Sequence, residues 1–325
     1  MNILITSGSR KVWLVKAFKD ALKSLGMKGK VMTVDKDPLS ASLYKSDGGF
    51  VVPASTSPGF LRAIMDICEK KKIGLLVPAR DGELMLFAEN KALFQKRGVL
   101  VAVSDKEVIE KSGDKYAFHA FLSGIGLKTP RTGLLSDRAR ADIGFPMMLK
   151  PRYGSGSRGV RMLMGPADLS RVSTDPGGWI LQEYIAGREF TVDVFSDIGR
   201  NVISVIPRER IEVVSGESYK ARTVKSDDIS SAAIRLVKKI RSFGQVTIQC
   251  IRNDSGVYFI DMNPRPGGGS ALSIKAGGDY PRFLIEQASG KRTVPILGNY
   301  EIGLVMLRYS EDIIIKEGDV LPECP

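Results

Sequence analysis

Three oxygen-bearing side chains share one face of a predicted hairpin. Residues 245–263 contain two apolar runs, VTIQCI and GVYFIDMN, separated by the turn Asp254-Ser255-Gly256. A three-residue loop with glycine in the left-handed position would pair Gln249 with Asp261. Because side chains alternate along a strand, Gln249, Asp261 and Asn263 would then lie together. The opposite face would be apolar, with Val246, Ile248, Cys250, Tyr258, Ile260 and Met262.

This set of donors suits Mg²⁺, which prefers oxygen ligands and takes only a few from protein when phosphates and water supply the rest. A solvated polar sheet face is the alternative interpretation. The residues that follow Asn263, PRPGGGS, favour the metal. Arg265 could stabilise a transferring phosphoryl group, and the glycines permit close backbone approach to a ligand.

A second phosphate-binding element is the segment KPRYGSGSRG, residues 150–159. Its Gly-x-Gly-x-x-Gly pattern is not a dinucleotide fingerprint, because VRMLM follows it and is typical of a strand, not a helix. The segment is therefore predicted to be a hairpin flap whose backbone amides cover phosphates, with Lys150 adding a positive charge. The candidate flap contacts are Gly154, Ser155, Gly156, Ser157 and Gly159.

A third element, LQEYIAGREF, spans residues 181–190. An apolar strand runs into a short link and then into another strand. Backbone groups of such a link can pair with an adenine edge, and Glu189 could accept hydrogen bonds from ribose hydroxyls. The pattern alone does not establish either role.

The elements that must position these residues fall into two classes. Residues 1–110 alternate short apolar strands with helices, which predicts a doubly wound parallel sheet. Asp81 and Glu83 follow its fourth strand, at the carboxyl end where such sheets bind ligands. From Asp114 onward, strands with turn signals and few helices predict an α+β arrangement; REFTVDVFSD, NVISVIP and RERIEVVS are expected as three separate strands, and EIGLVMLRY as a last one. The fold class is therefore α/β and α+β.

Composition narrows the chemistry. The 325 residues carry 48 Lys and Arg against 36 Asp and Glu, for a net charge of +12. Such a chain can bind anions, but it lacks a long basic run or a nucleic-acid motif, so we expect small phosphorylated ligands and no nucleic acid. No apolar run approaches the length of a membrane span and the N-terminus does not resemble a signal peptide, so we expect a cytoplasmic protein without membrane contact.

Histidine and cysteine are scarce. His119, the one histidine, lies in a predicted helix, is interpreted as structural and argues against a multi-histidine zinc site. Of the three cysteines, Cys68 and Cys250 lie in apolar runs and are predicted to be core residues, and Cys324 lies near the end of the chain. Catalysis is left to carboxylates, amides, lysines and arginines.

The order of motifs resembles the ATP-grasp superfamily. Asp114-Lys115, KPRYGSGSRG, QEYIAGRE and DMNPRPGGG follow one another as in the large subunit of carbamoyl phosphate synthetase and the related single-module ligases. The resemblance covers nearly the whole chain, and residues 1–110 look like the preATP-grasp domain of that group. It implies a Rossmann-like preATP-grasp domain, an ATP-grasp small lobe, and a large lobe with a C-terminal tail, at residues 1–113, 114–180 and 181–325.

The resemblance also implies how the nucleotide binds. Lys115 and Lys150 would contact its phosphates, and Glu189 would hold the ribose. Four residues would form the adenine-binding link: Gln182, Glu183, Tyr184 and Ile185. Three would bind Mg²⁺, or Mn²⁺ in its place: Gln249, Asp261 and Asn263.

Three basic residues would act on the reacting phosphate. The resemblance implies that Arg265 stabilises the transferred group, and that Lys220 and Arg222, in SGESYKARTVKS, form a basic loop over the phosphates. The family often has glutamate where Asp261 stands, so the shorter side chain bears on whether one residue bridges two metals.

The implied activity is that of an ATP- and Mg²⁺-dependent, ADP-forming ligase that converts a small carboxylate to an acyl phosphate and passes it to an amine. A homodimer is the expected assembly. Phosphorylation of bicarbonate or carbamate, with a partner chain, is an alternative. A non-catalytic nucleotide-binding module is another, which Gln249, Asp261, Asn263 and Arg265 speak against. A nicotinamide enzyme is a distant third, because ITSGSRKV does not match the dinucleotide fingerprint.

Overall fold

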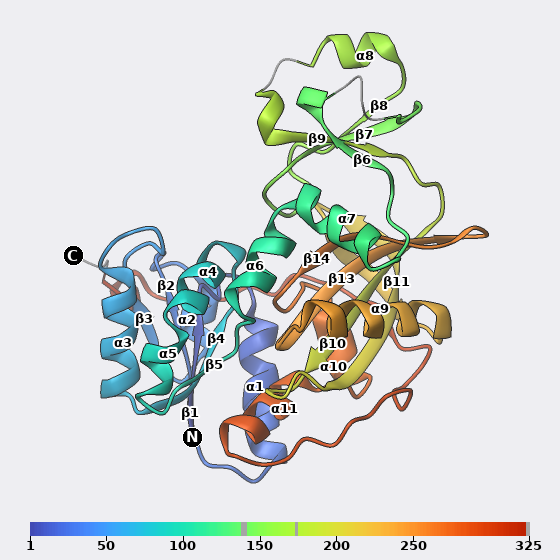
Figure 1. Cartoon of the computed structure of the whole chain (residues 1–325). Coiled ribbons are helices and arrows are strands. Elements are labelled where there is room, and N and C mark those ends of the chain that lie inside the picture. Colours follow the sequence, from blue (N-terminus) through green and yellow to red (C-terminus); the bar gives the residue numbers. More distant parts are fainter. Residues whose placement is uncertain (138–141, 173–174, 323–325) are drawn as a thin grey trace.

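The computed structural model describes residues 1–137, 142–172 and 175–322. Three sheets organise these residues (Figure 1): a five-stranded parallel sheet at the N-terminal side, a six-stranded sheet beside it, and a four-stranded sheet at one end of the molecule. The predicted fold class, a doubly wound sheet followed by an α+β region, is confirmed. Cys324 lies outside the described residues.

The parallel sheet has the order β3-β2-β1-β4-β5. Its strands are β1 (Asn2–Thr6), β2 (Val31–Asp35), β3 (Gly49–Val51), β4 (Ile73–Pro78) and β5 (Leu100–Val101). Its helices are α1 (Val12–Ser24), α2 (Ala41–Lys45), α3 (Phe60–Lys70), α4 (Asp81–Glu89), α5 (Lys91–Gln95) and α6 (Lys106–Gly113). The chain runs outward in opposite directions from β1 and β4, so the loops after these two strands diverge. Such a switch point is where open parallel sheets bind ligands.

The four-stranded sheet has the order β6-β9-β7-β8 and carries the flap. Its strands are β6 (Thr132–Leu134), β7 (Met147–Pro151), β8 (Arg161–Leu163) and β9 (Trp179–Glu183). Helix α7 (Lys115–Gly124) precedes it and α8 (Pro166–Ser170) follows β8. Strands β7 and β8 pair in antiparallel fashion on either side of the glycine-rich segment. The prediction that this segment is a hairpin flap, without the helix of a dinucleotide fingerprint, is confirmed.

The six-stranded sheet has the order β14-β13-β10-β11-β12-β15. Its strands are β10 (Arg188–Ser196), β11 (Val202–Val214), β12 (Glu217–Thr223), β13 (Gly244–Asn253), β14 (Gly256–Asn263) and β15 (Val305–Leu307). The helices of this region are α9 (Asp227–Ile240), α10 (Ser270–Lys275) and α11 (Tyr280–Ala288). The two strands expected over residues 201–215 are one strand, β11. Pro207 does not end it, because its carbonyl still accepts a hydrogen bond of 3.1 Å from the Val224 amide.

The hairpin register is as predicted where the candidate ligands lie, but not at the turn. Gln249 faces Asp261, whereas Cys250 faces Phe259, so Ile260 is an extra residue that forms a bulge. The loop contains two residues instead of three, because Asn253 pairs with Gly256. The bulge turns Phe259 into the core in place of Tyr258 and Ile260, which corrects two of the predicted apolar positions.

The two faces of this sheet differ, as the alternation predicts. Val246, Ile248, Cys250 and Met262 are buried in a core that includes side chains of α7 and α9. A second core joins α1, β1 and β4 of the parallel sheet to α11. This packing brings the switch point of the parallel sheet next to the loop that follows β14. Cys68 is also buried, so both cysteines predicted to be core residues are confirmed.

Candidate functional site

The polar face of the six-stranded sheet gathers the predicted metal ligands. Thr191 of β10 pairs with Gln249, and Gln249 pairs with Asp261. Asn263 pairs with Thr247, and its side-chain amide nitrogen donates to Asp261 Oδ2 at 3.3 Å. All three candidate ligands are half-buried. The structure therefore brings Gln249, Asp261 and Asn263 together, as the sequence predicts.

This donor set fits Mg²⁺ bound jointly with a nucleotide. It offers one carboxylate and two amide oxygens, and such a site depends on phosphate oxygens for the remaining ligands. Within residues 1–137, 142–172 and 175–322, no cluster of three or more His, Cys, Asp or Glu could hold a metal by itself. An ion held by Gln249, Asp261 and Asn263 would therefore depend on a bound phosphate for its remaining ligands.

Two lysines lie at the base of the flap. Lys150, at the end of β7, donates from Nζ to Gln182 Oε1 at 2.6 Å. Burial lowers the pKa of Lys150, while the charge of Asp261 opposes this shift. Lys115 donates from Nζ to the Gly154 carbonyl at 2.5 Å. Lys150 is thus bound to β9, and Lys115 to the flap itself.

Asp114 sets the position of Lys115. Its carboxylate caps α7 by accepting from the Tyr116 amide at 3.0 Å, and it also accepts from Arg152 Nη2 at 2.6 Å. Arg152 begins the flap, so one carboxylate joins the helix start to the flap. The burial of Asp114 would raise its pKa, but hydrogen bonds from Arg152 and from the helix amides lower it. An ionised Asp114 is what both contacts require.

The flap reaches across to the parallel sheet. Ser155 Oγ donates to Asp81 Oδ2 at 2.8 Å. A side chain at Gly216, in the turn between β11 and β12, would come within 2.9 Å of the Gly156 backbone. Gly156 itself has φ +73°, a conformation that favours glycine. The flap is therefore held over the site by contacts from two other segments.

Arg265 and Asp81 form the contact between the loop after β14 and the switch point. Arg265 donates from Nε and Nη2 to the two carboxylate oxygens of Asp81, at 2.6 Å each. Burial would raise the pKa of Asp81, but the hydrogen bonds and charge of Arg265 lower it. Lys11, after β1, donates to the Ala79 carbonyl, and burial lowers the pKa of Lys11 to about 8. The sequence predicts Asp81 at this edge but does not predict Lys11.

Glu83, the other acid expected at this edge, has a structural role. It is fully buried, and its carboxylate accepts hydrogen bonds from Thr6 Oγ1 at 2.6 Å and from Ser7 Oγ at 2.8 Å. Burial raises the pKa of Glu83. It ties the loop after β1 to the loop after β4.

The predicted adenine link comprises the last two residues of β9, Gln182 and Glu183, and the two that follow, with Gln182 buried. Glu183 is bound to Arg131 through a hydrogen bond of 3.3 Å from Arg131 Nε, and its own amide donates to the Arg131 carbonyl at 2.8 Å. Tyr184 is 41% exposed, and Ile185 is partly exposed. These side chains are free of the core, in keeping with a surface that a base could cover.

Glu189 lies on the polar face of the six-stranded sheet, which is also the face of the candidate metal ligands, and it already has a partner. It forms an ion pair with Arg210 of β11, whose side chain is 4% exposed. Arg210 also donates to the Gly216 carbonyl at 2.9 Å, so it connects Glu189 to the turn that touches the flap. Sequence reasoning missed Arg210. Arg210 can be recognised as the partner of Glu189 only when the pairing of β10 with β11 is known, because the two residues then lie opposite each other.

Lys220 and Arg222 do not form a loop over the phosphates, and this prediction is wrong. Both lie in strand β12, where Lys220 pairs with Glu212 at 2.7 Å and Arg222 with Glu209 at 2.6 Å. Their position in a regular strand determines which side of the sheet they occupy.

That side is the one opposite the candidate metal ligands. Arg208 is paired in register with Thr223. The Arg208 side chain donates to Asp193, and Asp193 also accepts a hydrogen bond from Thr247, the residue paired with Asn263. Thr223 therefore shares the polar face, and the neighbouring position, Arg222, projects from the other one, as does Lys220. Their charges are directed away from the site.

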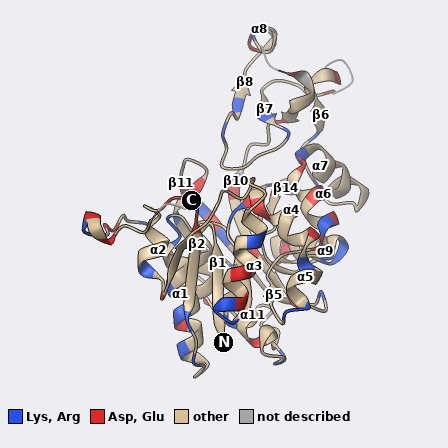
Figure 2. Ribbon diagram, turned by 90° about the vertical axis from the view of Figure 1, so that its left-hand side faces the viewer, with Lys and Arg blue, Asp and Glu red and all other residues tan. Residues whose placement is uncertain are grey.

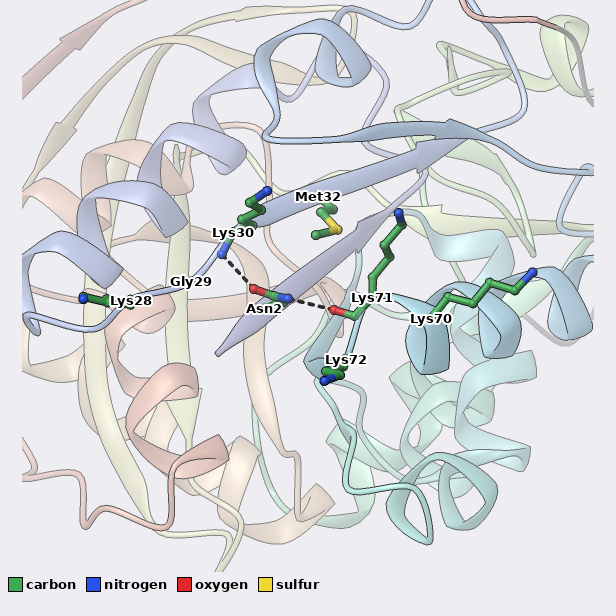
Figure 3. A pocket seen from close by; sticks show the side chains of 8 residues that line it. All are labelled: Asn2, Lys28, Gly29, Lys30, Met32, Lys70, Lys71 and Lys72. Atoms are coloured by element: carbon green, nitrogen blue, oxygen red, sulfur yellow. Dashed lines mark hydrogen bonds between the residues drawn. The ribbon is translucent and has the colours of Figure 1, made fainter.

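A hollow of about 580 Å³ elsewhere in the molecule is not part of this site (Figure 3). Its lining is Asn2, Lys28, Gly29, Lys30, Met32, Lys70, Lys71 and Lys72. These residues lie at the amino-terminal edge of the parallel sheet, whereas Asp81 and Lys11 lie at the carboxyl edge.

The basic residues in general are spread over many elements (Figure 2). Among the described residues, no helix is both long and apolar enough to span a membrane.

Comparison with known proteins identifies the architecture. Residues 112–269 match the family model of the ATP-grasp domain, and residues 3–102 match that of the PylC-like N-terminal domain. The chain contains an ATP-grasp domain behind a PylC-like N-terminal domain. The candidate metal ligands, the flap and Arg265 all lie within the ATP-grasp match.

More distant relatives agree with this. The chain is 22% identical over 262 residues to the arginine-specific large chain of carbamoyl phosphate synthase from Bacillus subtilis; the match covers 75% of this chain and 25% of the relative. This chain thus spans about a quarter of the length of that relative.

Solved structures show the same fold. The biotin carboxylase domain of Hydrogenobacter thermophilus 2-oxoglutarate carboxylase, a dimer in complex with MgADP, ADP and bicarbonate, has a TM-score of 0.74 at 20% identity, over 93% of this chain and 73% of that one. N5-carboxyaminoimidazole ribonucleotide synthetase from Thermotoga maritima has a TM-score of 0.66 at 18% identity, over 90% of this chain and 77% of that one.

Proposed function

We propose that this chain is an ATP- and Mg²⁺-dependent, ADP-forming carboxylate–amine ligase. The observation that carries the proposal is the convergence of Asp261, Lys150, the flap and Arg265 on one side of the six-stranded sheet, next to the switch point of the parallel sheet. In this proposal the preATP-grasp domain, small lobe and large lobe are residues 1–113, 114–180 and 181–325. The boundary near residue 113 is supported by the gap between the two family matches.

In this mechanism the chain positions charges and supplies no nucleophile of its own. A substrate carboxylate oxygen attacks the γ-phosphorus, the bond to the bridging oxygen breaks, and ADP leaves. The amine nitrogen then attacks the acyl carbon and loses a proton, and phosphate leaves. Bound Mg²⁺ would neutralise the charge on the phosphate oxygens. Lys115 and Lys150 hold the phosphates, and the flap excludes water. Arg265 releases Asp81 and binds the transferring phosphoryl group instead.

Phosphorylation of bicarbonate or carbamate is the second candidate. It is favoured by the Bacillus subtilis relative, a carbamoyl phosphate synthase chain, and by the bicarbonate bound to the Hydrogenobacter thermophilus domain. A partner chain would then supply further steps.

The proposal of a carboxylate–amine ligase also includes a homodimer, a cytoplasmic location and the use of Mn²⁺ in place of Mg²⁺. It further includes an adenine-binding link formed by residues Gln182 to Ile185, next to Glu189.

A thermal-shift titration tests nucleotide binding. We expect a non-hydrolysable ATP analogue with Mg²⁺ to raise the melting temperature, because a ligand that binds only the native state stabilises it. The rise should be smaller with EDTA and absent with NAD. Phosphate release is then screened with pooled carboxylates and amines, and with bicarbonate alone. Equal stabilisation by NAD would refute the proposal, and nucleotide binding without phosphate release from any pool would favour a non-catalytic module.

Hydrogen exchange tests the role of the flap. Residues 154–159 are exposed and contain little apolar surface, so their amides should exchange rapidly in the free protein. Addition of the Mg²⁺-bound analogue should slow them, because phosphate oxygens accept from backbone amides. The exposed turn between β13 and β14, residues 254–255, provides the internal comparison, and its exchange should not change. Equal exchange rates with and without nucleotide would contradict a flap that covers phosphates.

A further inference from the structure

His119 is buried next to Gln182, which contacts Lys150, although its sequence context indicates only a structural residue. It lies on α7 and is 3% exposed. Its Nδ1 contacts Thr129 Oγ1, and its Nε2 lies 2.7 Å from the Gln182 side-chain nitrogen. Gln182 in turn contacts Lys150. One histidine is thus a single residue away from a lysine proposed to bind phosphate.

The hydrogen bonds in this cluster determine the orientation of the Gln182 amide and the tautomer of His119. An ammonium group donates and never accepts, so the Gln182 oxygen must face Lys150 and its nitrogen must face the other way. That nitrogen has two hydrogens and two acceptors, His119 Nε2 at 2.7 Å and Thr132 Oγ1 at 3.0 Å. His119 therefore presents a lone pair at Nε2 and carries its hydrogen on Nδ1.

The other side of the ring is consistent with this tautomer. Thr129 Oγ1 donates to the Phe259 carbonyl at 2.9 Å, which leaves its lone pairs to accept from His119 Nδ1. Phe259 lies on β14, two positions before Asp261. The hydrogen bonds thus run without interruption from the strand of the candidate metal ligands to the lysine at the base of the flap.

The ring must be neutral for this arrangement to hold. Burial, together with the charge of Lys150, lowers the pKa of His119 to about 3. A neutral ring adds no positive charge beside Lys150. The amide of Gln182 likewise forms no ion pair with the ammonium group, so that the ammonium remains available to an anionic ligand.

We propose that His119 is a positioning residue for the nucleotide: it orients the Gln182 amide so that its oxygen holds Lys150 in the site, and through Thr129 it ties this lysine to β14. The proposal rests on the proposed function, since it assigns Lys150 to a phosphate. A histidine that only fills the core would contribute to stability and not to nucleotide affinity.

Four variants separate the two roles. His119→Leu removes both ring nitrogens, and His119→Gln keeps a side-chain acceptor. Leu122→Ala is the matched control, because Leu122 is fully buried on the same helix and lies outside the hydrogen-bonded cluster. Thr129→Val interrupts the same hydrogen bonds with little change in volume, and it carries the test if His119→Leu does not fold.

Melting temperature and affinity for the Mg²⁺-bound ATP analogue are measured for each variant. We expect His119→Leu to weaken binding roughly tenfold, since it leaves a buried amide without its acceptor. Thr129→Val should weaken binding several-fold, His119→Gln should recover part of the loss, and Leu122→Ala should lower stability without changing affinity. Adding His119→Leu to Lys150→Met should cost no further affinity, because the lysine it positions is gone.

The proposal is overturned if His119→Leu, or Thr129→Val in its place, binds the analogue as tightly as Leu122→Ala does. It is also overturned if the losses from His119→Leu and Lys150→Met are additive. A wild-type chain that does not bind the analogue would contradict the proposed function itself, and that result is obtained before any variant is compared.

Discussion

Asp261→Asn is expected to reduce turnover by roughly 10³-fold, because removing the one carboxylate of the proposed metal site costs several kcal/mol of charge stabilisation in the transition state. Asp261 is half-buried on the polar face and is not part of the apolar core. The melting temperature should therefore change little. The part of ATP affinity that depends on Mg²⁺ should be lost, which a titration with and without EDTA measures.

Asp254→Asn is the matched control for this variant. It makes the same chemical change on the same hairpin, in the exposed turn between β13 and β14. Turnover and affinity should remain those of the wild type. If Asp261→Asn behaves like Asp254→Asn, the polar face is a solvated surface and the metal assignment fails.

Arg265→Ala is expected to leave Mg²⁺-dependent ATP binding largely intact and to slow turnover by roughly 10³-fold, in the range found for arginines that stabilise a transferring phosphoryl group. Its contact should strengthen as charge develops on that group, so kcat should fall more than affinity does. Single-turnover phosphate release and analogue affinity, measured in parallel, check both parts.

The ion pair with Asp81 offers a competing explanation, because Arg265 also joins the ATP-grasp domain to the parallel sheet. Asp81→Asn distinguishes the two. It weakens the same contact but keeps the guanidinium, so its effect on turnover should be much smaller. If both variants lose turnover and melting temperature equally, Arg265 serves the contact between domains and not the reaction.

Part of the site could be predicted from short stretches of sequence. The pairing of Gln249 with Asp261 was predicted from strand alternation and a three-residue loop, and the structure confirms the pair, although it is formed by a two-residue loop together with the bulge at Ile260. The flap could be separated from a dinucleotide fingerprint because a strand pattern follows it. Both arguments use rules that act over a few neighbouring residues, as does the parallel sheet predicted from its alternating strands and helices.

The same local rules failed where a strand departs from regularity. The bulge at Ile260 changed the buried face of β14, because the core accepts Phe259 there. The loop over Lys220 and Arg222 was implied by the family resemblance and not by a local rule. The pairing of β12 with β11 decided their true position.

The chain by itself determined which chemical groups are present, the parallel class of the N-terminal sheet and the pairing of Gln249 with Asp261. Only the tertiary structure decided that Arg265 meets Asp81, 184 residues away, and that His119 reaches Lys150 through Gln182. The first contact depends on the core that the parallel and six-stranded sheets share, whereas the four-stranded sheet has its own core and meets α7 through polar contacts such as that of Gln182 with His119. Packing of that kind is a property of the whole set of buried side chains, so no short segment encodes it.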